Sequence, residues 1–466
     1  MASGALDADV IVVGGGAAGL AAAAALDALS LRVLLLEGRA RLGGRVAASA
    51  SGVDLGAQWI HGADVDGGAN PVLQIARAAG LATAPARYHN ARAVGADGAE
   101  VSDARERAME AAYRRALRAA RSRTEPSLGA RFDAALAAGG ASAAEASDAR
   151  HALATYVEGE WGADAAWLDG AAWDEGADVR GGDLILPGGL AAIVPYMRGA
   201  LGACVDVREG ARVTRVDYGG AGVRVVVAAA EPGGEERVFA ARAAIITLPL
   251  GVLKAGLGAR SVLPPVANAA TVAFSPPLPL AHAAAIDALG FGLLQKFICS
   301  FDASVDLSAA AKFDMLEFVS APGAARPWPE WLVLKHYAPA RNVLIAFSAG
   351  SEALALSAAS DTDVVAALAA QLRILLGMPD LPAPSVERSK WEADEFACGS
   401  YSFLAPGAKP AHRAQLAAPF AGGRMVFAGE ACEVDYSATV HGAILSGRRA
   451  AAAVARALAA GGGAQV

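Results

Sequence analysis

The chain opens with two short apolar runs, Val10–Val13 and Val33–Leu36, separated by a glycine-rich turn and an alanine-rich stretch of helical length. A short apolar run bounded by turn residues is typical of a strand that is buried on both faces. The pattern therefore predicts a strand, a helix and a second strand. Because a crossover helix joins parallel neighbours, this order is the start of a parallel sheet.

Further runs predict where strands and helices return. Strands are expected at 211 to 216, Val223–Val227, 244 to 248 and 425 to 428. From 274 to 384, the strand-like runs FICSF, EWLVLKHY and NVLIAFSAG alternate with helical stretches such as TDVVAALAAQLRILLG. Residues 103 to about 156 have a helical period, because AMEAAYRRALRAARSR carries apolar residues at helical spacing with arginines on the opposite face.

Gly14, Gly16 and Gly19 follow the first apolar run in the spacing G-x-G-x-x-G. In that pattern the first glycine makes a tight turn, the second lets a pyrophosphate approach bare backbone, and the third lets helix and strand pack closely. The second run ends in Glu37, where a carboxylate can accept hydrogen bonds from an adenosine ribose. Together they predict a dinucleotide site rather than a glycine turn without a ligand.

Nicotinamide and flavin dinucleotides both use such a unit, and the next residues favour the flavin. Arg39, Gly43, Gly44 and Arg45 place two arginines and a second glycine pair just past the ribose carboxylate. Guanidinium groups pair well with phosphates, and close backbone beside the pyrophosphate suits a cofactor that stays bound. FAD is therefore the expected cofactor.

Length and charge narrow the class further. At 466 residues the chain exceeds one compact core, so two connected domains are expected. Alanine supplies much of the 55% hydrophobic fraction, and no strongly apolar, charge-free stretch reaches the ~20 residues of a membrane span. The formal charge of −7 is mild, and no basic block points to a nucleic-acid partner.

The cysteines and the two ends of the chain suggest an ordinary reduced compartment. Cys204, Cys299, Cys398 and Cys432 lie far apart, with no CxxC pair and no histidine at metal-ligand spacing, so buried thiols and no metal are expected. MASGALDADV lacks the regions of a secretory signal, and GGGAQV carries neither a peroxisomal tripeptide nor a hydrophobic anchor. A cytoplasmic protein without a membrane anchor is expected.

The later motifs resemble those of the flavin-dependent amine oxidase superfamily, which includes polyamine oxidases, monoamine oxidases and lysine-specific histone demethylases. They are ITLPLGVLK (246 to 254), SPPLP (275 to 279), LGFGLLQKFICSFD (289 to 302), KWEADEFACGSYSF (390 to 403) and VFAGEACEVDYSATVHGAILSG (426 to 447). The resemblance spans nearly the whole chain. It implies an α/β amine oxidase fold, with a Rossmann-type, glutathione-reductase-like FAD-binding domain interleaved with an α+β substrate domain.

The same resemblance sets the expected domain boundaries. Residues 1 to 85, 185 to 270 and 387 to 466 are expected to form the FAD-binding domain. Residues 86 to 184 and 271 to 386 are expected to form the substrate-binding domain, with the helical segment covering the substrate cavity.

The resemblance also carries over the cofactor contacts. They are Gly14, Gly16, Ala18, Gly19, Glu37, Arg39, Gly44, Arg45, Gln58, Trp59, Val213, Trp391, Gly429, Glu430, Thr439 and Val440. The backbone of Val213 is expected to meet the adenine, and Glu430 to lie near the ribityl or pyrophosphate region. The helix that begins at Thr439 would direct its positive end at the flavin, where it stabilises negative charge on the reduced ring.

Lys296 is the first candidate for a role in the reaction. It lies in an otherwise apolar run with Phe297 and Ile298, so its amine must find a partner or reach water. A strand lysine usually reaches the surface. The position matches the lysine that holds a water beside the flavin N5 in the family, which favours a catalytic role instead.

Two aromatic residues, Trp391 and Tyr401, are the next candidates. Large aromatics usually pack in a core, but by resemblance these line the flavin ring and the substrate path, where aromatic faces attract a cationic amine. Tyr401 matches one wall of the aromatic cage of monoamine oxidases. The other wall corresponds to Thr439, so the cage is incomplete, which argues against a typical monoamine oxidase.

The attachment of the flavin also departs from monoamine oxidases. Those enzymes bind FAD covalently through a cysteine immediately before the cage tyrosine, and that place is Ser400 here. Cys398 lies two positions earlier and is not expected to reach the same carbon. Non-covalent FAD is therefore predicted.

His61, in GAQWIHG, points to the polyamine branch, because WIHG resembles the animal acetylpolyamine and spermine oxidases. A histidine there can accept a hydrogen bond from an amine or keep it neutral. The alternative is a loop histidine bonded to backbone. Glu158 and Glu160 are carboxylates that can reach a distal ammonium, although solvated helix positions are the simpler expectation for both.

The resulting hypothesis is FAD-dependent oxidation of a polyamine, such as spermine, spermidine or an N-acetylated derivative. A hydride passes to flavin N5, the imine is hydrolysed to an aldehyde and an amine, and O2 reoxidises the flavin to give H2O2. A demethylase shares YSATVHGA and LPLGVLK, but its extra N-terminal domain and helical insertion are not expected here. An L-amino-acid oxidase needs an arginine clamp that we do not identify. A monoamine oxidase, a desaturase and a non-catalytic binding protein of the same fold are also compatible with these motifs.

Overall fold

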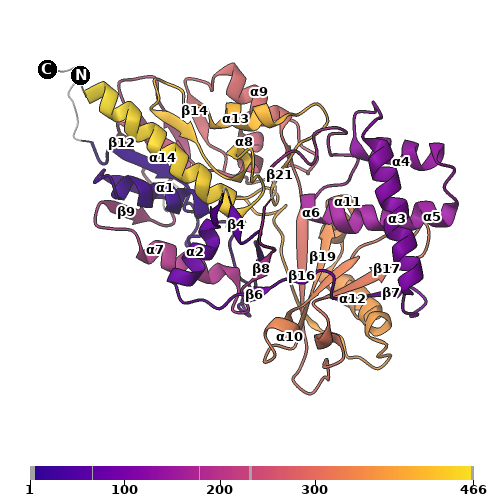
Figure 1. Ribbon diagram of the computed structural model, residues 1–466. Coiled ribbons are helices and arrows are strands. Elements are labelled where there is room, and N and C mark those ends of the chain that lie inside the picture. The colour runs from indigo at the N-terminus through magenta and orange to yellow at the C-terminus, as the bar shows by residue number, and fades with distance from the viewer. Residues whose placement is uncertain (1–5, 66, 178, 230–233, 463–466) are drawn as a thin grey trace.

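A five-stranded parallel sheet organises one lobe of the molecule, and the chain returns to this parallel-sheet lobe from three regions (Figure 1). The computed structural model describes residues 6–65, 67–177, 179–229 and 234–462. In spatial order the strands are β22 (Met425–Phe427), β13 (Ala243–Ile246), β1 (Val10–Val13), β2 (Val33–Leu36) and β9 (Val205–Arg208). Every residue of β1 and β2 is buried, as expected for strands covered on both faces.

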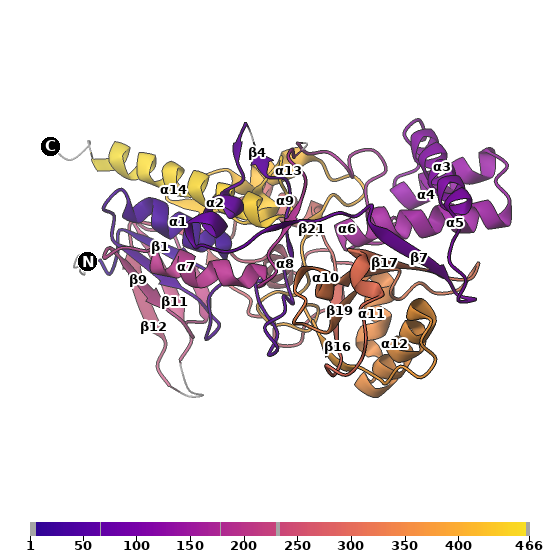
Figure 2. The same ribbon diagram turned by 60° about the horizontal axis from the view of Figure 1, so that its bottom comes forward.

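The glycine turn leads from β1 into α1 (Ala17–Asp27), which packs beside the long C-terminal helix α14 (Val440–Gly462) in Figures 1 and 2. Small residues permit this approach, because a Cβ on Gly447 would lie 2.2 Å from the Ala18 carbonyl oxygen. The predicted strand, helix and parallel strand are confirmed with their predicted order. The final helix was expected to begin at Thr439, and α14 begins one residue later, at Val440.

A second sheet of four strands shares its core with the parallel sheet. Its order is β12 (Arg237–Ala241), β11 (Val223–Val227), β10 (Val213–Asp217) and β14 (Ala273–Ser275). The strand predicted at Val223–Val227 is confirmed with its bounds. The run at 211 to 216 starts its strand only at Val213, because the preceding backbone is engaged elsewhere: the Ala211 amide donates to the Glu37 carbonyl oxygen at 2.7 Å.

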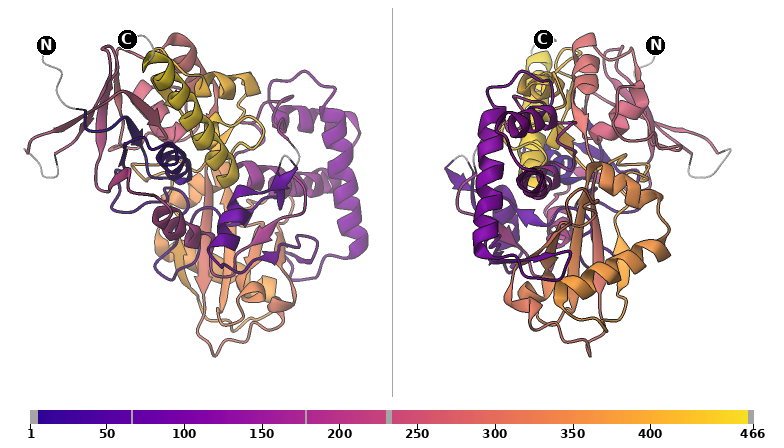
Figure 3. Two further views of the ribbon diagram at one scale, coloured as in Figure 1. Left: turned by 60° about the vertical axis from the view of Figure 1, so that its left-hand side comes forward. Right: turned by 90° about the vertical axis from the view of Figure 1, so that its right-hand side faces the viewer.

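The other lobe is built on a six-stranded sheet, drawn mainly in orange in Figure 3. Its order is β20 (Ser385–Arg388), β16 (Leu294–Ser300), β19 (Val343–Ala349), β18 (Glu330–Val333), β17 (Met315–Val319) and β7 (Ala91–Gly95). Lys296 pairs with Phe347, Phe347 with Glu330, and Glu330 with Glu317. Directly paired residues share a sheet face, so these four side chains form one row.

One predicted strand is wrong over its second half. EWLVLKHY was expected to be extended throughout, but β18 ends at Val333 and Leu334–Tyr337 forms the short helix α10. The polar residues of this turn bond outside the sheet. His336 Nδ1 lies 2.9 Å from the Ala311 carbonyl oxygen, and the Tyr337 hydroxyl donates to Asp314. These contacts end the strand where the apolar run stops.

Helices between residues 103 and 161 form a separate layer beside the six-stranded sheet, drawn in purple in Figures 1 and 3. They are α3 (Asp103–Ala120), α4 (Leu128–Ala138), α5 (Ala143–Leu153), the π-helical turn η1 (Ala154–Glu158) and α6 (Gly159–Trp161). The serines Ser102, Ser127 and Ser142 cap the first three helices. The helical segment predicted for 103 to about 156 is confirmed, and we call it the cover.

The remaining elements are short connections and surface helices. The small sheets are β3 (Trp59–Ile60), β8 (Leu184–Ile185) and β6 (Ala84–Pro85); β4 (Asp64–Val65) and β5 (Gly68–Ala69); and β15 (Gly290–Phe291) and β21 (Ser402–Phe403). The helices are α2 (Pro71–Ala78), α7 (Ile193–Gly199), α8 (Leu250–Leu257), α9 (Leu280–Ala288), α11 (Gly350–Ala358), α12 (Asp361–Leu376), α13 (Pro410–Ala417) and the 3-10 turns η2 (Leu190–Ala192), η3 (Ala310–Lys312) and η4 (Glu430–Cys432). No helix in the described part of the chain combines the length and apolarity that a membrane span requires.

The strands of each lobe come mostly from the segments assigned to one expected domain. β20 crosses the expected boundary at 386 and 387, and β14 pairs with β10 although it falls in the segment assigned to substrate binding. The boundaries themselves stay a prediction. Among the cysteines, the thiols of Cys299, Cys398 and Cys432 are buried and unpaired as expected, whereas Cys204 is partly accessible.

Candidate active site

A cavity of about 680 Å³ runs from the glycine turn to the cover. It brings together residues from both lobes and from distant parts of the sequence. Of the predicted site residues, Gly14, Gly16, Ala18, Glu37, Arg39, Gly44, Arg45, Gln58, Trp59, His61, Val213, Lys296, Trp391, Tyr401, Gly429, Glu430, Thr439 and Val440 line it. Gly19 lies behind the wall, where a Cβ would come within 1.9 Å of the Gly14 carbonyl oxygen.

The glycine turn leaves room for a ligand against its backbone. Gly14 has a φ of +104°, and a Cβ there would lie 2.5 Å from the Thr247 hydroxyl oxygen. A Cβ on Gly16 would meet no protein atom within 4 Å, because the space beyond it is the cavity. Gly16 is also the N-cap of α1 and provides no side-chain cap, so the first amides of the helix face that space. This geometry suits a pyrophosphate.

Glu37 is fixed where a ribose would lie. Its Oε2 accepts the Gly15 amide at 2.7 Å and its Oε1 accepts the Arg39 amide at 2.8 Å. Burial raises the pKa of this carboxyl, and the two backbone hydrogen bonds oppose that rise. The Arg39 guanidinium lines the cavity and pairs with both oxygens of Asp394 at 2.8 and 2.6 Å.

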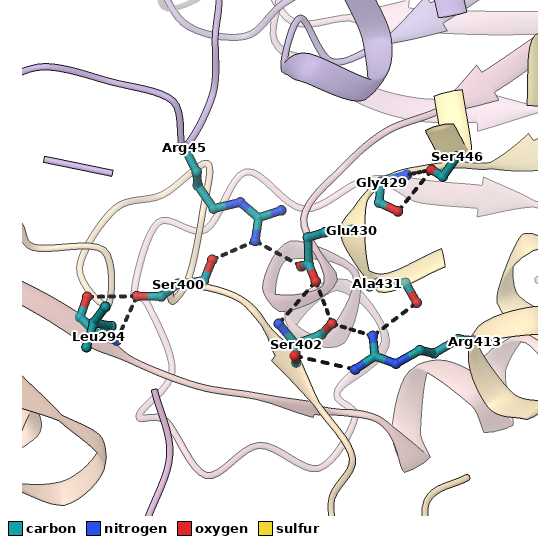
Figure 4. Close-up of polar contacts among 9 residues, drawn as sticks. All are labelled: Arg45, Leu294, Ser400, Ser402, Arg413, Gly429, Glu430, Ala431 and Ser446. Carbon is teal, nitrogen blue, oxygen red and sulfur yellow. Dashed lines mark hydrogen bonds and ion pairs between the residues drawn. The ribbon is translucent and has the colours of Figure 1, made fainter. Parts of the chain in front are cut away.

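Arg45 reaches the last segment of the chain (Figure 4). Its Nη1 donates to the Ser400 carbonyl oxygen at 2.6 Å and to Glu430 Oε1 at 3.0 Å. Among the described residues, no hydrogen bond to Arg45 Nε or Nη2 accompanies these two, and the side chain lines the cavity. The free edge of the guanidinium suits a phosphate oxygen.

The first turn of α14 closes the opposite wall. Thr439 caps the helix, since its hydroxyl oxygen accepts the Gly442 amide at 2.9 Å and donates to the Tyr436 carbonyl oxygen at 2.7 Å. Val440 lies at the cavity surface. Across the cavity the Trp59 indole N–H is buried and lacks a partner among the described residues. An orphaned donor in a cavity wall is expected where a polar ligand is to bind.

Lys296 lies at the junction of the two lobes and does not reach the surface. The residue is 2% exposed, and its Nζ donates to Gln58 Oε1 at 2.8 Å and to the Asp54 carbonyl oxygen at 3.2 Å. Burial lowers the pKa of this amine to about 7, and the Asp54 carboxylate opposes the fall. A lysine that is neutral in part near pH 7 can accept and return a proton.

Asp54 supports that lysine and was missed from the sequence, although it stands four residues before Gln58 in VDLGAQW. Its carboxylate accepts the amides of Leu190 and Ala191 at 2.7 and 2.9 Å and the Gln58 side-chain amide at 3.3 Å. Burial raises the pKa of Asp54, and the positive charge of Lys296 opposes part of that rise. The Asp54 carboxylate therefore fixes the Gln58 side chain and the Asp54 backbone, whose oxygens accept the hydrogen bonds of the Lys296 amine.

Trp391 and Tyr401 both line the cavity. The Trp391 indole donates to the Leu55 carbonyl oxygen at 3.3 Å. The Tyr401 hydroxyl donates to the carbonyl oxygen of Glu160 at 2.9 Å, which ties the aromatic wall to the cover. Cys398 is not among the cavity-lining residues, and Ser400 directs its hydroxyl to the backbone of Leu294. Both placements agree with non-covalent FAD, which stays a prediction.

His61 bonds to a carboxylate, so the alternative of a loop histidine bonded to backbone is wrong. Its Nδ1 lies 2.9 Å from Asp183 Oδ2, and the same oxygen accepts the Tyr88 hydroxyl at 2.9 Å. Burial acts to raise the pKa of Asp183, but the hydrogen bonds from His61, the Gly62 amide and Tyr88 outweigh it and lower the pKa. Asp183 lies 122 residues after His61, so sequence reasoning had no spacing from which to find it.

The expectation of a solvated position is wrong for Glu158, whereas Glu160 is exposed as expected. Glu158 turns inward and accepts the Ala165 amide at 2.8 Å, and burial raises its pKa to about 7. Glu160 faces the cavity, where burial raises its pKa and His61 opposes the rise. The π-helical turn η1 ends at Glu158, two residues before Glu160, and π turns are frequent at functional sites.

Charge divides along the cavity. The arginines of the wall, Arg39, Arg45 and Arg212, belong to the parallel-sheet lobe, which also contributes the carboxylates of Glu37 and Glu430. The part beside the cover has acidic and aromatic residues, namely Glu160, Trp161, Trp173, Asp174, Glu175, Asp183 and Asp435. One end therefore suits phosphates and the other suits a cation.

Sequence comparison decides the family. The family model described as flavin containing amine oxidoreductase matches residues 17–455. The chain belongs to this family. As a flavin amine oxidoreductase it uses FAD, and the open space at Gly16, the free edge of Arg45 and the orphaned Trp59 donor fit that cofactor.

Two groups of relatives match the chain. The chain is 31% identical to polyamine oxidase 1 of Oryza sativa subsp. japonica, covering 95% of this chain and 96% of that protein. It is also 31% identical to lysine-specific histone demethylase 1 homolog 2 of the same plant, covering 96% of this chain. Here the chain spans only 57% of the relative's length.

A solved structure supports the fold. Wild-type putrescine oxidase bound to putrescine superimposes with a TM-score of 0.72 at 18% sequence identity, covering 96% of this chain and 99% of that one. The expected amine oxidase fold is confirmed.

Proposed function

We propose that this FAD-dependent amine oxidase acts on polyamines, releasing an aldehyde, a shorter amine and H2O2. The observation that carries the proposal is the acidic end of the cavity beside Lys296. Glu160, Glu175 and Asp183 line that end, and none of the described arginines does. A substrate with several ammonium groups would gain from each carboxylate, whereas a monoamine would use one of them.

A long substrate would extend from the cavity along a row of paired residues on the six-stranded sheet, of which Lys296 is the member that lines the cavity. Starting at Lys296, the row passes through Phe347 to Glu330 and Glu317. Neighbouring strands lie about 4.8 Å apart, so the backbone at Glu330 is roughly 10 Å from that at Lys296. Neither carboxylate forms an ion pair with another described residue, and burial raises the pKa of Glu330 to about 8. A distal ammonium would restore its charge.

Each part of the site has a defined task in such a reaction. Bound FAD supplies the two-electron acceptor. The His61 imidazole, oriented by Asp183, accepts the proton that a substrate ammonium must lose before its α carbon can be oxidised. The Lys296 amine is placed to hold a water or move a proton at the junction of the lobes. Trp391 and Tyr401 exclude bulk water and present aromatic faces to the amine.

The test is peroxide release by the purified yellow protein, with the flavin spectrum followed anaerobically. The panel is spermine, spermidine, N-acetylated polyamines, a monoamine and an amino acid. Peroxide and bleaching with the polyamines alone would support the proposal. Equal turnover of the monoamine would contradict the polyamine specificity, and bound flavin that no amine bleaches would favour a desaturase or another substrate class.

A second candidate is oxidation of methylated lysine. The 31% identity to a histone demethylase homologue over 96% of this chain favours it. A dimethyl-lysine peptide therefore belongs in the panel. Formaldehyde release from that peptide, with no response to polyamines, would replace the first proposal.

A further inference from the structure

Arg413 is a buried arginine directly behind the cofactor wall. It lies in α13 (Pro410–Ala417), is 1% exposed and is not among the residues that line the cavity. Burying a guanidinium is costly unless its charge and its N–H groups find partners. The partners of Arg413 therefore identify the charge and the acceptors that offset the cost of its burial.

Figure 4 shows that those contacts lead through Ser402 to Glu430, which lines the cavity. Arg413 Nη1 donates to the Ser402 hydroxyl oxygen at 2.6 Å, and Nη2 lies 3.4 Å from the Ser402 carbonyl oxygen. The Ser402 hydroxyl in turn donates to Glu430 Oε2 at 2.5 Å. Glu430 is 5% exposed, and its other oxygen accepts Arg45 Nη1. One serine thus joins the buried arginine to the carboxylate at the cavity wall.

The charges of these side chains bear on how the site binds an anionic ligand. Glu430 lies in the wall of a site that receives the two negative charges of a pyrophosphate, and a buried carboxylate there would repel them. Arg45 and Arg413 approach Glu430 from opposite sides, so the three side chains together carry one net positive charge (two arginines and one glutamate). The nearby Glu433 pairs with Arg449 at 2.5 Å, and it raises the pKa of Arg413 less than Glu430 does.

We infer that Arg413 is a positioning residue for FAD: through Ser402 it offsets the charge of Glu430, and Glu430 then holds Arg45 with its free edge toward the pyrophosphate. The inference concerns FAD alone and is independent of which amine the enzyme oxidises. Arg413 touches neither cofactor nor substrate, so its effect should appear in cofactor affinity before it appears in chemistry.

The experiment titrates FAD into apoprotein and follows the quenching of flavin fluorescence. Arg413→Gln should weaken FAD binding by at least about tenfold, because it leaves a buried carboxylate uncompensated beside an anionic ligand. Arg413→Lys keeps the charge and should stay much closer to the unaltered protein. The double variant Arg413→Gln with Glu430→Gln also removes the negative charge of Glu430, so most of the FAD affinity should return. A purely structural arginine would not be rescued by removing Glu430.

Arg388→Gln is the matched control, because this side chain is only 9% exposed and lies in β20 of the other lobe. It should lower the melting temperature without changing FAD affinity. If Arg413→Gln does not fold, Ser402→Ala cuts the same connection and should weaken FAD binding severalfold. Unchanged affinity in Ser402→Ala or Arg413→Gln, or equal losses in the single and double variants, would overturn the inference.

Discussion

The Lys296 amine lies 2.8 Å from the side-chain oxygen of Gln58, and this hydrogen bond joins the six-stranded sheet to the segment that follows the dinucleotide motif. Both residues line the cavity. The reacting end of the site is therefore assembled only when the two lobes are packed together. Asp54 holds the contact from behind, since it receives the Gln58 amide and lies beside the lysine.

Asp54→Asn should lower the pKa of Lys296 while FAD stays bound. The carboxylate raises the pKa of Lys296 against the effect of burial, so its loss should lower that pKa further below about 7. In rapid-mixing experiments, any limb of the pH profile of flavin reduction that belongs to Lys296 should move to lower pH. Asp27→Asn is the control, because Asp27 also accepts backbone amides, of Gly202 and Cys204, but lies outside the cavity. A limb that stays in place in Asp54→Asn would contradict this coupling.

Gly16→Ala should separate cofactor binding from folding. The added Cβ meets no protein atom, and Gly16 has a φ of −74° that alanine adopts readily, so the apoprotein should keep its melting temperature. The same carbon enters the space assigned to the pyrophosphate, and FAD affinity should fall by at least about tenfold. The comparison is Gly19→Ala, whose Cβ would come within 1.9 Å of the Gly14 carbonyl oxygen and should destabilise the apoprotein itself. Full FAD affinity in Gly16→Ala would place the pyrophosphate elsewhere.

Local patterns were enough for the parts of the fold that lie close together in sequence. The strands Val10–Val13 and Val33–Leu36 follow from apolar runs bounded by turns, and site residues within recognisable motifs, such as Lys296, could be matched by resemblance. What the sequence could not supply were partners fixed by tertiary packing. Asp183 meets His61 only because β8 pairs with β3, and Glu158 is the last residue of a π-helical turn that its sequence does not announce.

Glu330→Gln should change the choice of substrate more than the chemistry. If the row from Lys296 through Phe347 guides an extended amine, removing the Glu330 charge should raise KM for spermine by about tenfold and leave KM for a monoamine unchanged. The rate of flavin reduction at saturating amine should change little. Glu387→Gln, in β20 of the same sheet, is the control and should leave both KM values unchanged, because its carboxylate accepts the Ala50 amide and does not belong to the row that starts at Lys296. An equal rise for both amines would remove Glu330 from substrate selection.

Lys296→Met should remove a pH dependence of stability that the buried amine creates. The pKa of Lys296 is about 7 in the folded protein, below its ordinary value of 10.5, so the unfolded chain binds more protons between these two values. The free energy of unfolding therefore rises with pH across that window, and the penalty for burying the charged amine is complete below about 7. Methionine of similar length abolishes the penalty, so Lys296→Met should be more stable than the unaltered protein at pH 6. The difference should shrink as the pH approaches 10.

Melting temperatures of the two apoproteins, measured from pH 6 to 9, test this directly, and two parallel curves would show that the lysine is not neutralised by burial. The same variant should keep FAD bound yet reduce it more slowly with amine, which separates the proton role of Lys296 from its place in the fold.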